Sequence, residues 1–250
     1  MFKIRKLRCE YLENPIGIGE QKPRFSWVLD SDEKNIFQTS YRIQVSKDND
    51  SFLNLLWDSE VVKSDNSVHV EYKGPQLGSR IRYYYRVRIS NNKNNESPWS
   101  KTNFFETGIL DTKEWQAAFI SCDATESPEF SSSSPLLRKE FNINEEFVSA
   151  RVYVTSLGLY ELWLNGQRVG EDLLTPGWTN YNKRLQYQTY NVTAILKKGA
   201  NAVGAMLGNG WYKGHLAGWM EDTKERYGKR TALFLQLHIT YSDGSEQVIL

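Results

Sequence analysis

The sequence predicts an all-β protein built from two successive β-sandwiches. Short segments that alternate apolar and polar residues recur along most of the chain, which is the pattern of half-buried strands. Turn residues such as Asn-Gly, Asp-Gly and Pro-Gly separate these segments. Only residues 191–196 have helical character. The 250 residues are enough for two domains with real cores, for which we predict the bounds 1–108 and 115–250.

The first domain, residues 1–108, is predicted to contain seven short strands and no helix. In residues 40–46, Tyr41, Ile43 and Val45 share one face. Residues 81–90 place aromatic and aliphatic side chains on one face and arginines on the other. The remaining strands are expected at 2–10, 24–29, 57–61, 67–72 and 103–108. This spacing predicts an Ig-like sandwich, and the tyrosine-rich strand followed by SPWS also resembles a fibronectin type III module.

The second domain, residues 115–250, follows a short linker. A strand is expected at 117–121, and the Ser-rich stretch 123–135 is expected to be a mobile loop. Residues 159–164 alternate clearly, and Asn165-Gly166 then predicts a tight hairpin. Residues 191–196 are expected to be helical, with a cap at Asn191 or Thr193 and Gly199 after the end. Further strands are expected at 136–141, 185–190, 201–207, 231–241 and 246–250.

Residues 231–241 have the longest alternation. Leu233, Leu235, Leu237, Ile239 and Tyr241 are predicted to face inward, which places His238 on an exposed sheet face. The sequence stops within the return strand that follows Asp243-Gly244. We therefore expect the chain to be the N-terminal piece of a longer protein, with this second, jelly-roll-like sandwich cut short.

Composition excludes several classes of partner. A net charge of +1 gives no electrostatic case for nucleic acid or for a membrane surface. The N-terminus carries charges throughout, so we expect no signal peptide there, and no run approaches the ~20 apolar residues of a membrane span. The two cysteines lie far apart in sequence, so we expect no disulfide and a cytoplasmic protein. The 8 Trp and 14 Tyr suit either a sheet-rich or a sugar-contacting protein.

Four segments of the second half carry a family resemblance: YELWLNGQRVG, TPGWTNYNKRLQYQTYNVT, LGNGWYKG and YGKRTALFLQLHITYSDGS. They resemble the N-terminal accessory β-sandwich of bacterial α-L-rhamnosidases of glycoside hydrolase family 78, in which a fibronectin-like module stands directly ahead. The resemblance implies a parent enzyme that hydrolyses terminal α-L-rhamnose with inversion. It also implies that the catalytic carboxylates belong to a helical C-terminal domain, which is absent from this chain.

No residue of this chain is therefore predicted to be catalytic. Glycoside hydrolysis needs two facing carboxyl groups, and none of the candidates stands in a context that argues for a raised pKa. These candidates are Glu161, Glu171, Asp172, Glu221 and Asp222. His69, His215 and His238 lack metal-ligand spacing. The resembled domain is similar to a rhamnose-binding module that in one case uses calcium. Glu171 and Asp172 fall short of the about six to eight oxygens that calcium takes, so no metal is predicted and calcium use stays open.

The predicted sugar contacts lie in loops of the second domain. Trp178, Trp211 and Trp219 would stack on L-rhamnose or a rhamnoside, and Asn165, Asp172 and Asn209 would supply hydrogen bonds to its hydroxyls. Tyr181 and Tyr212 are close in sequence, so an aromatic cluster at one end of the sandwich is expected. Each feature has a structural alternative: Asn165 in a hairpin turn, and loop tryptophans that plug the ends of the sandwich. Trp163 is expected to be core or half-core.

Three functions stay open at this point. The chain is a sugar-binding module, a structural piece that docks on the missing catalytic domain, or an accessory module of another glycosidase or an adhesion protein. A large apolar surface would favour docking, whereas a groove lined with Trp and Asn would favour binding.

Overall fold

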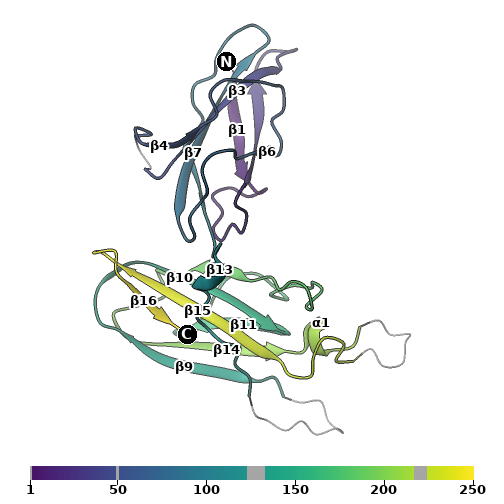
Figure 1. Ribbon diagram of the computed structural model, residues 1–250, viewed down its shortest axis with the longest axis vertical. Coiled ribbons are helices and arrows are strands. Elements are labelled where there is room, and N and C mark those ends of the chain that lie inside the picture. The colour runs from purple at the N-terminus through teal and green to yellow at the C-terminus, as the bar shows by residue number, and fades with distance from the viewer. Residues whose placement is uncertain (1, 49–50, 123–132, 217–223) are drawn as a thin grey trace. The chain divides into compact units, whose positions relative to one another are not determined.

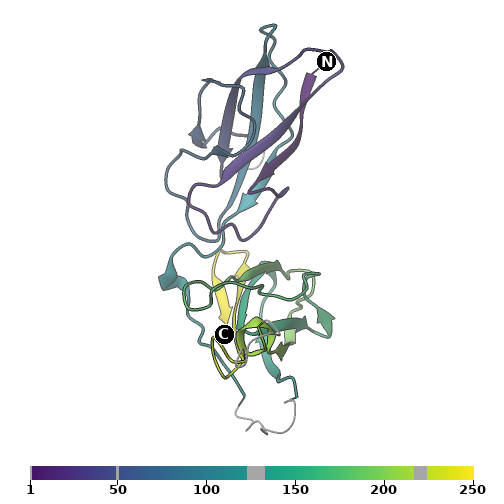
Figure 2. The ribbon, with the colours of Figure 1, turned by 90° about the vertical axis from the view of Figure 1, so that its right-hand side faces the viewer.

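The computed structural model describes residues 2–48, 51–122, 133–216 and 224–250. The chain divides into two compact units, Met1–Glu114 and Trp115–Leu250. The first is coloured from purple to teal and the second from teal to yellow (Figures 1 and 2). The prediction of an all-β fold is confirmed, because every named sheet is built from antiparallel strand pairs.

The first unit is a sandwich of two sheets. One sheet has the order β1-β2-β6, with β1 at Phe2–Cys9, β2 at Arg24–Ser31 and β6 at Val70–Glu71. The other has the order β4-β3-β7-β8, with β4 at Leu55–Asp58, β3 at Gln38–Ser46, β7 at Arg82–Asn91 and β8 at Asn103–Glu106. β5 (Val62–Lys63) pairs with β3, and a 3₁₀ turn, Thr112–Glu114, ends the unit.

The core of this unit is aromatic. Phe25 of one sheet packs against Tyr85 and Phe105 of the other, with ring centroids 4.7 and 5.9 Å away. The predicted alternation of β7 is confirmed, since Tyr83, Tyr85, Val87 and Ile89 are buried while the arginines between them are only half-buried. Packing aromatic rings from both sheets therefore closes the sandwich.

The second unit is also a two-layer sandwich. One sheet has the order β13-β10-β15-β16: β13 at Gln188–Asn191, β10 at Phe147–Leu157, β15 at Ala232–Tyr241 and β16 at Glu246–Ile249. The other has the order β12-β11-β14-β9: β12 at Gln167–Arg168, β11 at Leu159–Leu164, β14 at Gly199–Gly208 and β9 at Leu136–Ile143. A one-turn helix, α1 (Gly210–Lys213), follows β14.

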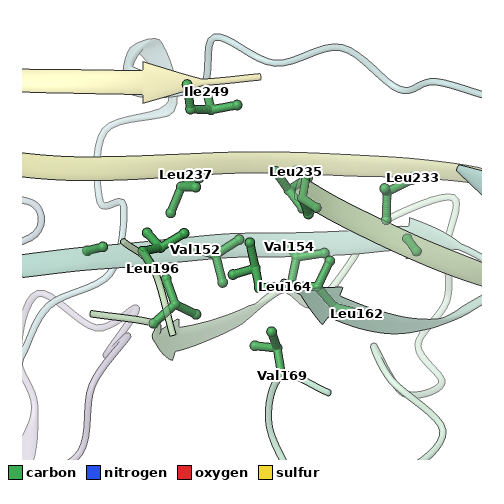
Figure 3. Close-up of a cluster of buried hydrophobic side chains, with 14 of the residues drawn as sticks. Val152, Val154, Leu162, Leu164, Val169, Leu196, Leu233, Leu235, Leu237 and Ile249 are labelled. Carbon is green, nitrogen blue, oxygen red and sulfur yellow. The ribbon is translucent and has the colours of Figure 1, made fainter. Parts of the chain in front are cut away.

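Aliphatic side chains from both sheets fill the space between the layers of the second unit. Figure 3 shows Val152 and Val154 of β10 beside Leu235 and Leu237 of β15, with Leu162 and Leu164 of β11 reaching toward them. The predicted inward set on β15 is confirmed for its leucines and Ile239, while Tyr241 is half-buried at the end of the strand. Whether the arrangement is a jelly roll stays a prediction.

Two predicted elements of this unit are wrong. Residues 191–196 form no named helix: Asn191 ends β13, and the N–H groups of Ile195 and Leu196 both donate to the Val192 carbonyl at 3.0 and 3.2 Å. Six residues are too few to stabilise a helix alone, and burial of Val192 and Leu196 in the core decides the conformation. The strand predicted at 117–121 is only an isolated bridge between Ile120 and Leu233.

The expectation of an exposed His238 is also wrong, because residues 115–120, here called the strap, cover that face. Gln236 Oε1 accepts the N–H groups of Gln116 and Ala117 at 2.8 and 3.3 Å. Trp115 of the strap packs edge-on against aromatic rings of the sheet. His238 is only 4% exposed, 2.6 Å from Gln236 Nε2 and 3.3 Å from a Glu246 oxygen. The alternation along β15 thus identified which residues share a face, but it did not predict that the strap covers the face of His238.

Two further expectations concern single positions of the second unit. Trp163 lies on the outer face of β11 and is 38% exposed, so the alternative that it belongs to the core is wrong. Most of the loop predicted at 123–135 lies outside the described residues. Within the described residues, no helix has the length and apolar character needed to cross a membrane.

Candidate functional site

Two loops meet at one end of the second unit and bring two tryptophans together. Trp178 lies in the loop that precedes β13, and Trp211 lies in α1 directly after β14. Their rings are parallel within 3°, with centroids 6.1 Å apart. We call them the tryptophan pair. Figure 1 shows α1 at this end of the strands, where β11 begins, β14 ends and β15 begins. The predicted clustering of these residues is therefore confirmed.

The first loop is fastened to the start of β11. Thr175 is buried, its hydroxyl donates to the Tyr160 carbonyl at 2.8 Å, and the Tyr160 N–H donates to the Thr175 carbonyl at 3.0 Å. Gln188 of β13 donates to the Pro176 carbonyl at 3.2 Å. Gly177 then adopts a φ of +96°, a conformation that favours glycine, and it directs the chain into Trp178. The ring position is thus set by bonds to two strands.

The second loop is placed by a close approach of backbone to side chain. Gly210 has a φ of +50°, and a Cβ at this position would lie 2.6 Å from Leu159 Cγ. Only glycine lets the chain pass so close to β11 and turn into α1. The Lys213 N–H donates to the Asn209 carbonyl at 3.1 Å, which closes the turn that carries Trp211. The Asn209 side chain is exposed and makes no hydrogen bond within the described part of the chain.

Three tyrosines pack beside the tryptophan pair. Tyr181 meets Tyr212 edge-on at 5.3 Å and Tyr227 at 5.0 Å between ring centroids. The Tyr181 hydroxyl donates to the Gly177 carbonyl at 3.1 Å, which ties the tyrosines to the loop of Trp178. Burial, and then the neighbouring Tyr227, raise the pKa of Tyr181. The Tyr181 hydroxyl is therefore a neutral donor at physiological pH.

The exposure of Trp178 distinguishes between the two roles considered for it, stacking on a sugar and plugging the end of the sandwich. Trp178 is 56% exposed, so it does not plug the end of the sandwich. Trp211 is half-buried. An exposed indole face held in place by a tightly bonded loop is available for stacking, and the exposed Asn209 amide offers both a donor and an acceptor. This arrangement suits noncovalent recognition of a flat, hydroxyl-rich ligand.

Asp172 belongs to a different group of contacts. One of its oxygens accepts the Tyr190 hydroxyl at 2.9 Å, and its carbonyl accepts from Arg168 at 2.8 Å. Burial of Tyr190, together with its bond to Asp172, raises the pKa of Tyr190 to about 12. Asp172 is exposed, but its hydrogen bonds lead to β12 and β13 rather than to the tryptophan pair.

Asn165 lies at the far end of β11 from the tryptophan pair. Six residues of extended chain separate it from Leu159, roughly 20 Å. Its amide donates to the Ile195 carbonyl at 2.9 Å and to Asn201 Oδ1 at 2.8 Å, and its Oδ1 accepts the Ala202 N–H at 2.9 Å. With a φ of 48°, Asn165 forms the predicted hairpin turn and uses its side chain inside the fold.

The remaining candidates fall into two groups. Trp219, Glu221 and Asp222 lie outside the described residues. Glu161 and Glu171 are both exposed. Within the described ranges, no three His, Cys, Asp or Glu residues gather closely enough to hold a metal ion.

Tyr227 is a member of the aromatic cluster that sequence reasoning missed. Its N–H donates to the Tyr212 carbonyl at 3.3 Å, and a Cβ on the next residue, Gly228, would lie 2.1 Å from the Tyr212 hydroxyl. The Tyr-Gly pair was the available signal, since a glycine beside an aromatic residue marks a close approach.

Two protein-family models match the chain. Residues 4–111 match the model described as "Rha78A-like, N-terminal immunoglobulin domain", and residues 145–250 match the "Alpha-L-rhamnosidase N-terminal domain". The two matches fall in different compact units.

Known relatives and solved structures agree with these matches. An α-L-rhamnosidase of Alteromonas sp. (strain LOR) is 39% identical over 246 residues, which is 94% of this chain but 26% of that protein. The structure of the α-L-rhamnosidase from Aspergillus terreus has a TM-score of 0.88 at 34% identity, over 100% of this chain and 28% of that one. The Streptomyces avermitilis enzyme, solved with L-rhamnose, gives 0.90 at 24% identity, over 100% of this chain and 40% of that one, and shows the fold alone. The chain thus spans about a quarter of the length of the curated relatives from Alteromonas sp. (strain LOR) and Formosa agariphila that it matches.

Proposed function

The chain belongs to the α-L-rhamnosidase family, of which it carries the two N-terminal domains, and we propose that its second unit binds L-rhamnose or a rhamnoside through the tryptophan pair. The single observation that supports this role is the parallel arrangement of the exposed Trp178 and the half-buried Trp211, with the exposed Asn209 two residues before Trp211. The proposed activity of the full-length protein is hydrolysis of terminal α-L-rhamnose from glycosides. Catalysis is assigned to a domain outside this chain.

The chemistry of the pair fits a deoxy-sugar. The C–H face of a pyranose and its methyl group are apolar and can lie on the exposed Trp178 indole. Hydroxyls at the ring edge can exchange hydrogen bonds with the exposed Asn209 amide. Each stacked ring contributes on the order of 1 kcal/mol, so we expect a Kd between about 0.1 and 10 mM. Weak binding of this kind is adequate for holding an enzyme near a glycan that presents many copies of the sugar.

The test is an NMR titration of the whole chain with L-rhamnose, with and without calcium. Both conditions are needed because residues 217–223, two of them acidic, lie outside the described part of the structure. We expect saturable shifts of the Trp178 and Trp211 indole N–H signals. The variant Trp178→Ala should weaken binding at least tenfold, whereas Trp163→Ala, which removes an exposed tryptophan from a different strand face, should leave the Kd unchanged.

A support role for the chain is the second candidate. Trp163, Met206 and Leu136 are exposed on one sheet face, and this apolar surface would suit docking on another domain of the protein. Absence of any rhamnose-dependent shift, with or without calcium, would favour this account over sugar binding. In either case we expect no turnover of an aryl α-L-rhamnoside by the chain alone, and turnover that survives repurification would contradict the assignment. A cytoplasmic location remains part of the proposal.

A further inference from the structure

The first unit has a groove that the proposed function does not use. It measures about 630 Å³ and lies between the first half of β1 and the segment that leads into β8. Its lining includes four basic residues, Lys3, Arg5, Lys6 and Lys101, and a single acidic one, Glu13. β1 and β8 are the outermost strands of their sheets, so the groove lies at an open edge of the sandwich.

Three of the four cations in this groove have no acidic partner among the residues that the structure describes. Arg5 is paired with Asp30 at 2.5 Å. Lys3, Lys6 and Lys101 are exposed, and within the described residues none of them makes an ion pair or a hydrogen bond. Elsewhere in this unit arginines are commonly matched with an acid, as Arg42 is with Asp58 at 2.6 Å and Arg82 with Glu106 at 3.0 Å, whereas the groove gathers three lysines without an acidic partner in the described part of the chain around one cavity. The groove therefore concentrates positive charge in a chain whose net charge is only +1.

The backbone around the groove does not suit an added peptide strand. The register of β1 shifts between Arg5 and Arg8, and Lys6 has a φ of 48°, so the free edge is bent at this point. The Asn103 amide donates to the Leu7 carbonyl at 2.9 Å, and Asn14 Oδ1 accepts the Phe104 N–H at 2.9 Å. Side chains thus already occupy two of the edge groups that an added strand would need.

The groove is lined by aliphatic side chains as well as by charged ones. Ile4 is half-buried and Leu7 is buried, and both line the same cavity as the lysines. A cavity lined by aliphatic side chains and ammonium groups matches a ligand with a C–H face and anionic substituents. We propose that this groove binds an anionic oligosaccharide, with its sulfate or carboxylate groups on Lys3, Lys6 and Lys101 and a sugar ring over Ile4. This site is separate in sequence and chemistry from the tryptophan pair and does not depend on sugar binding there.

The experiment uses the whole chain and defined anionic probes. A low-molecular-weight dextran sulfate and an oligogalacturonate distinguish sulfate from carboxylate recognition, and uncharged dextran of matched length controls for the sugar backbone. We expect at least one anionic probe to shift the backbone amide signals of residues 3–7 and Lys101, while uncharged dextran shifts none. A hexaglutamate peptide that binds ten times more tightly than both sugars would overturn the proposal in favour of a peptide site.

Matched variants distinguish binding in this groove from general electrostatic attraction to the chain. The triple variant Lys3→Gln, Lys6→Gln, Lys101→Gln should weaken binding roughly tenfold or more, from three surface charge contacts of ordinary strength. The control triple Lys34→Gln, Lys47→Gln, Lys73→Gln removes the same charge from exposed lysines elsewhere on this unit and should change the Kd less than twofold. Equal losses in both triples, or no saturable binding by the parent chain, would overturn the proposal and leave the lysines as protection of an open strand edge. An unchanged melting temperature in both triples verifies that the fold is intact.

Discussion

The two units have the same two-layer architecture, but different kinds of polar side chain connect their segments. In the first unit, arginines of the strands contact side chains of other segments. Arg42 forms an ion pair with Asp58 at 2.6 Å, and the Arg86 guanidinium lies 4.4 Å from the Trp99 ring centroid. In the second unit, side-chain amides link the segments. Asn165 accepts a backbone N–H of β14, and Gln236 accepts a backbone N–H of the strap. The arginine contacts of the first unit depend on charge, whereas the amide hydrogen bonds of the second unit do not.

This difference implies that the units respond to different stresses. The pKa of Asp58 is lowered because hydrogen bonds from Arg42, Gln44 and the Glu60 N–H outweigh the burial that acts to raise it. A carboxyl group with a lowered pKa stabilises the fold only while it is ionised. An amide has no such dependence. Acid should therefore weaken the charge-linked contacts of the first unit, whereas loss of packing or of an amide should weaken the second.

The largest expected effect comes from the core of the second unit. Leu162→Ala removes a side chain that is 1% exposed and should lower the free energy of unfolding of this unit by about 3 kcal/mol, because a buried cavity replaces the lost contacts. Native-state hydrogen exchange of β11 amides measures the loss, and β7 amides of the first unit should not change. The control Leu173→Ala, at 76% exposure, should have little effect. Equal acceleration of exchange in β7 would show that the units do not unfold independently.

Asn165 should have the next largest effect, on stability rather than on sugar binding. Asn165→Ala removes three side-chain hydrogen bonds and places alanine at a φ of 48°, so we expect a loss of about 2 kcal/mol. Asn209→Ala is the matched control, because its exposed amide makes no bond in the described structure and its removal should cost less than about 0.5 kcal/mol. Urea unfolding measures both variants. A stable Asn165→Ala variant that has lost rhamnose binding would restore the ligand role predicted from sequence.

Asp58 tests the dependence on charge. Asp58→Asn should lower the stability of the first unit by about 1 kcal/mol at pH 7, a value reduced for partial solvent access. Because its folded pKa lies below the unfolded value of about 3.9, the contribution is complete above that pH and is lost as the pH falls through the folded pKa. Urea unfolding at pH 7, 4 and 2 should show the gap between parent and variant closing at the lowest pH. Asp65→Asn, an exposed control, should show no gap, and a constant gap for Asp58→Asn would contradict the charge-based account.

The smallest expected change in stability is at the tryptophan pair. Trp178→Ala should alter the free energy of unfolding by less than about 0.5 kcal/mol, because the ring is 56% exposed. Its effect should appear in the rhamnose titration instead. A loss of several kcal/mol, read from the same urea experiment, would mean that the ring serves packing after all.

The sequence predicted most of the strands, because period-two alternation reports directly on which face of a sheet is buried. The strand expected at 117–121 is only an isolated bridge, and β10 is not among the predicted strands. The sequence also predicted an aromatic cluster at one end of the sandwich, because Tyr181 and Tyr212 lie close in sequence to Trp178 and Trp211. It did not predict the cover over His238. That cover comes from the strap, about 120 residues earlier in the chain, and alternation within one strand carries no information about a segment so distant.

The position of Asn165 shows a second limit of the sequence. Its dipeptide with Gly166 correctly predicted a turn, but the sequence could not say at which end of the sandwich that turn would lie. Register resolves the question, because Leu164 pairs with Val203 while Leu159 pairs with Gly208 beside α1. Likewise, the apparent helical signal at residues 191–196 is outweighed by tertiary packing of Val192 and Leu196.

The strap has a consequence for synthesis on the ribosome. Gln116 and Ala117 are the first polar partners of the second unit to emerge, yet the oxygen that accepts their N–H groups belongs to Gln236. The bridge of Ile120 to Leu233 has the same delay. All the named strands of the first unit lie before residue 107. The opening segment of the second unit, in contrast, bonds to a residue that is translated more than a hundred residues later. Translation order therefore makes the second unit the later one to close, with its first residues among the last to be secured.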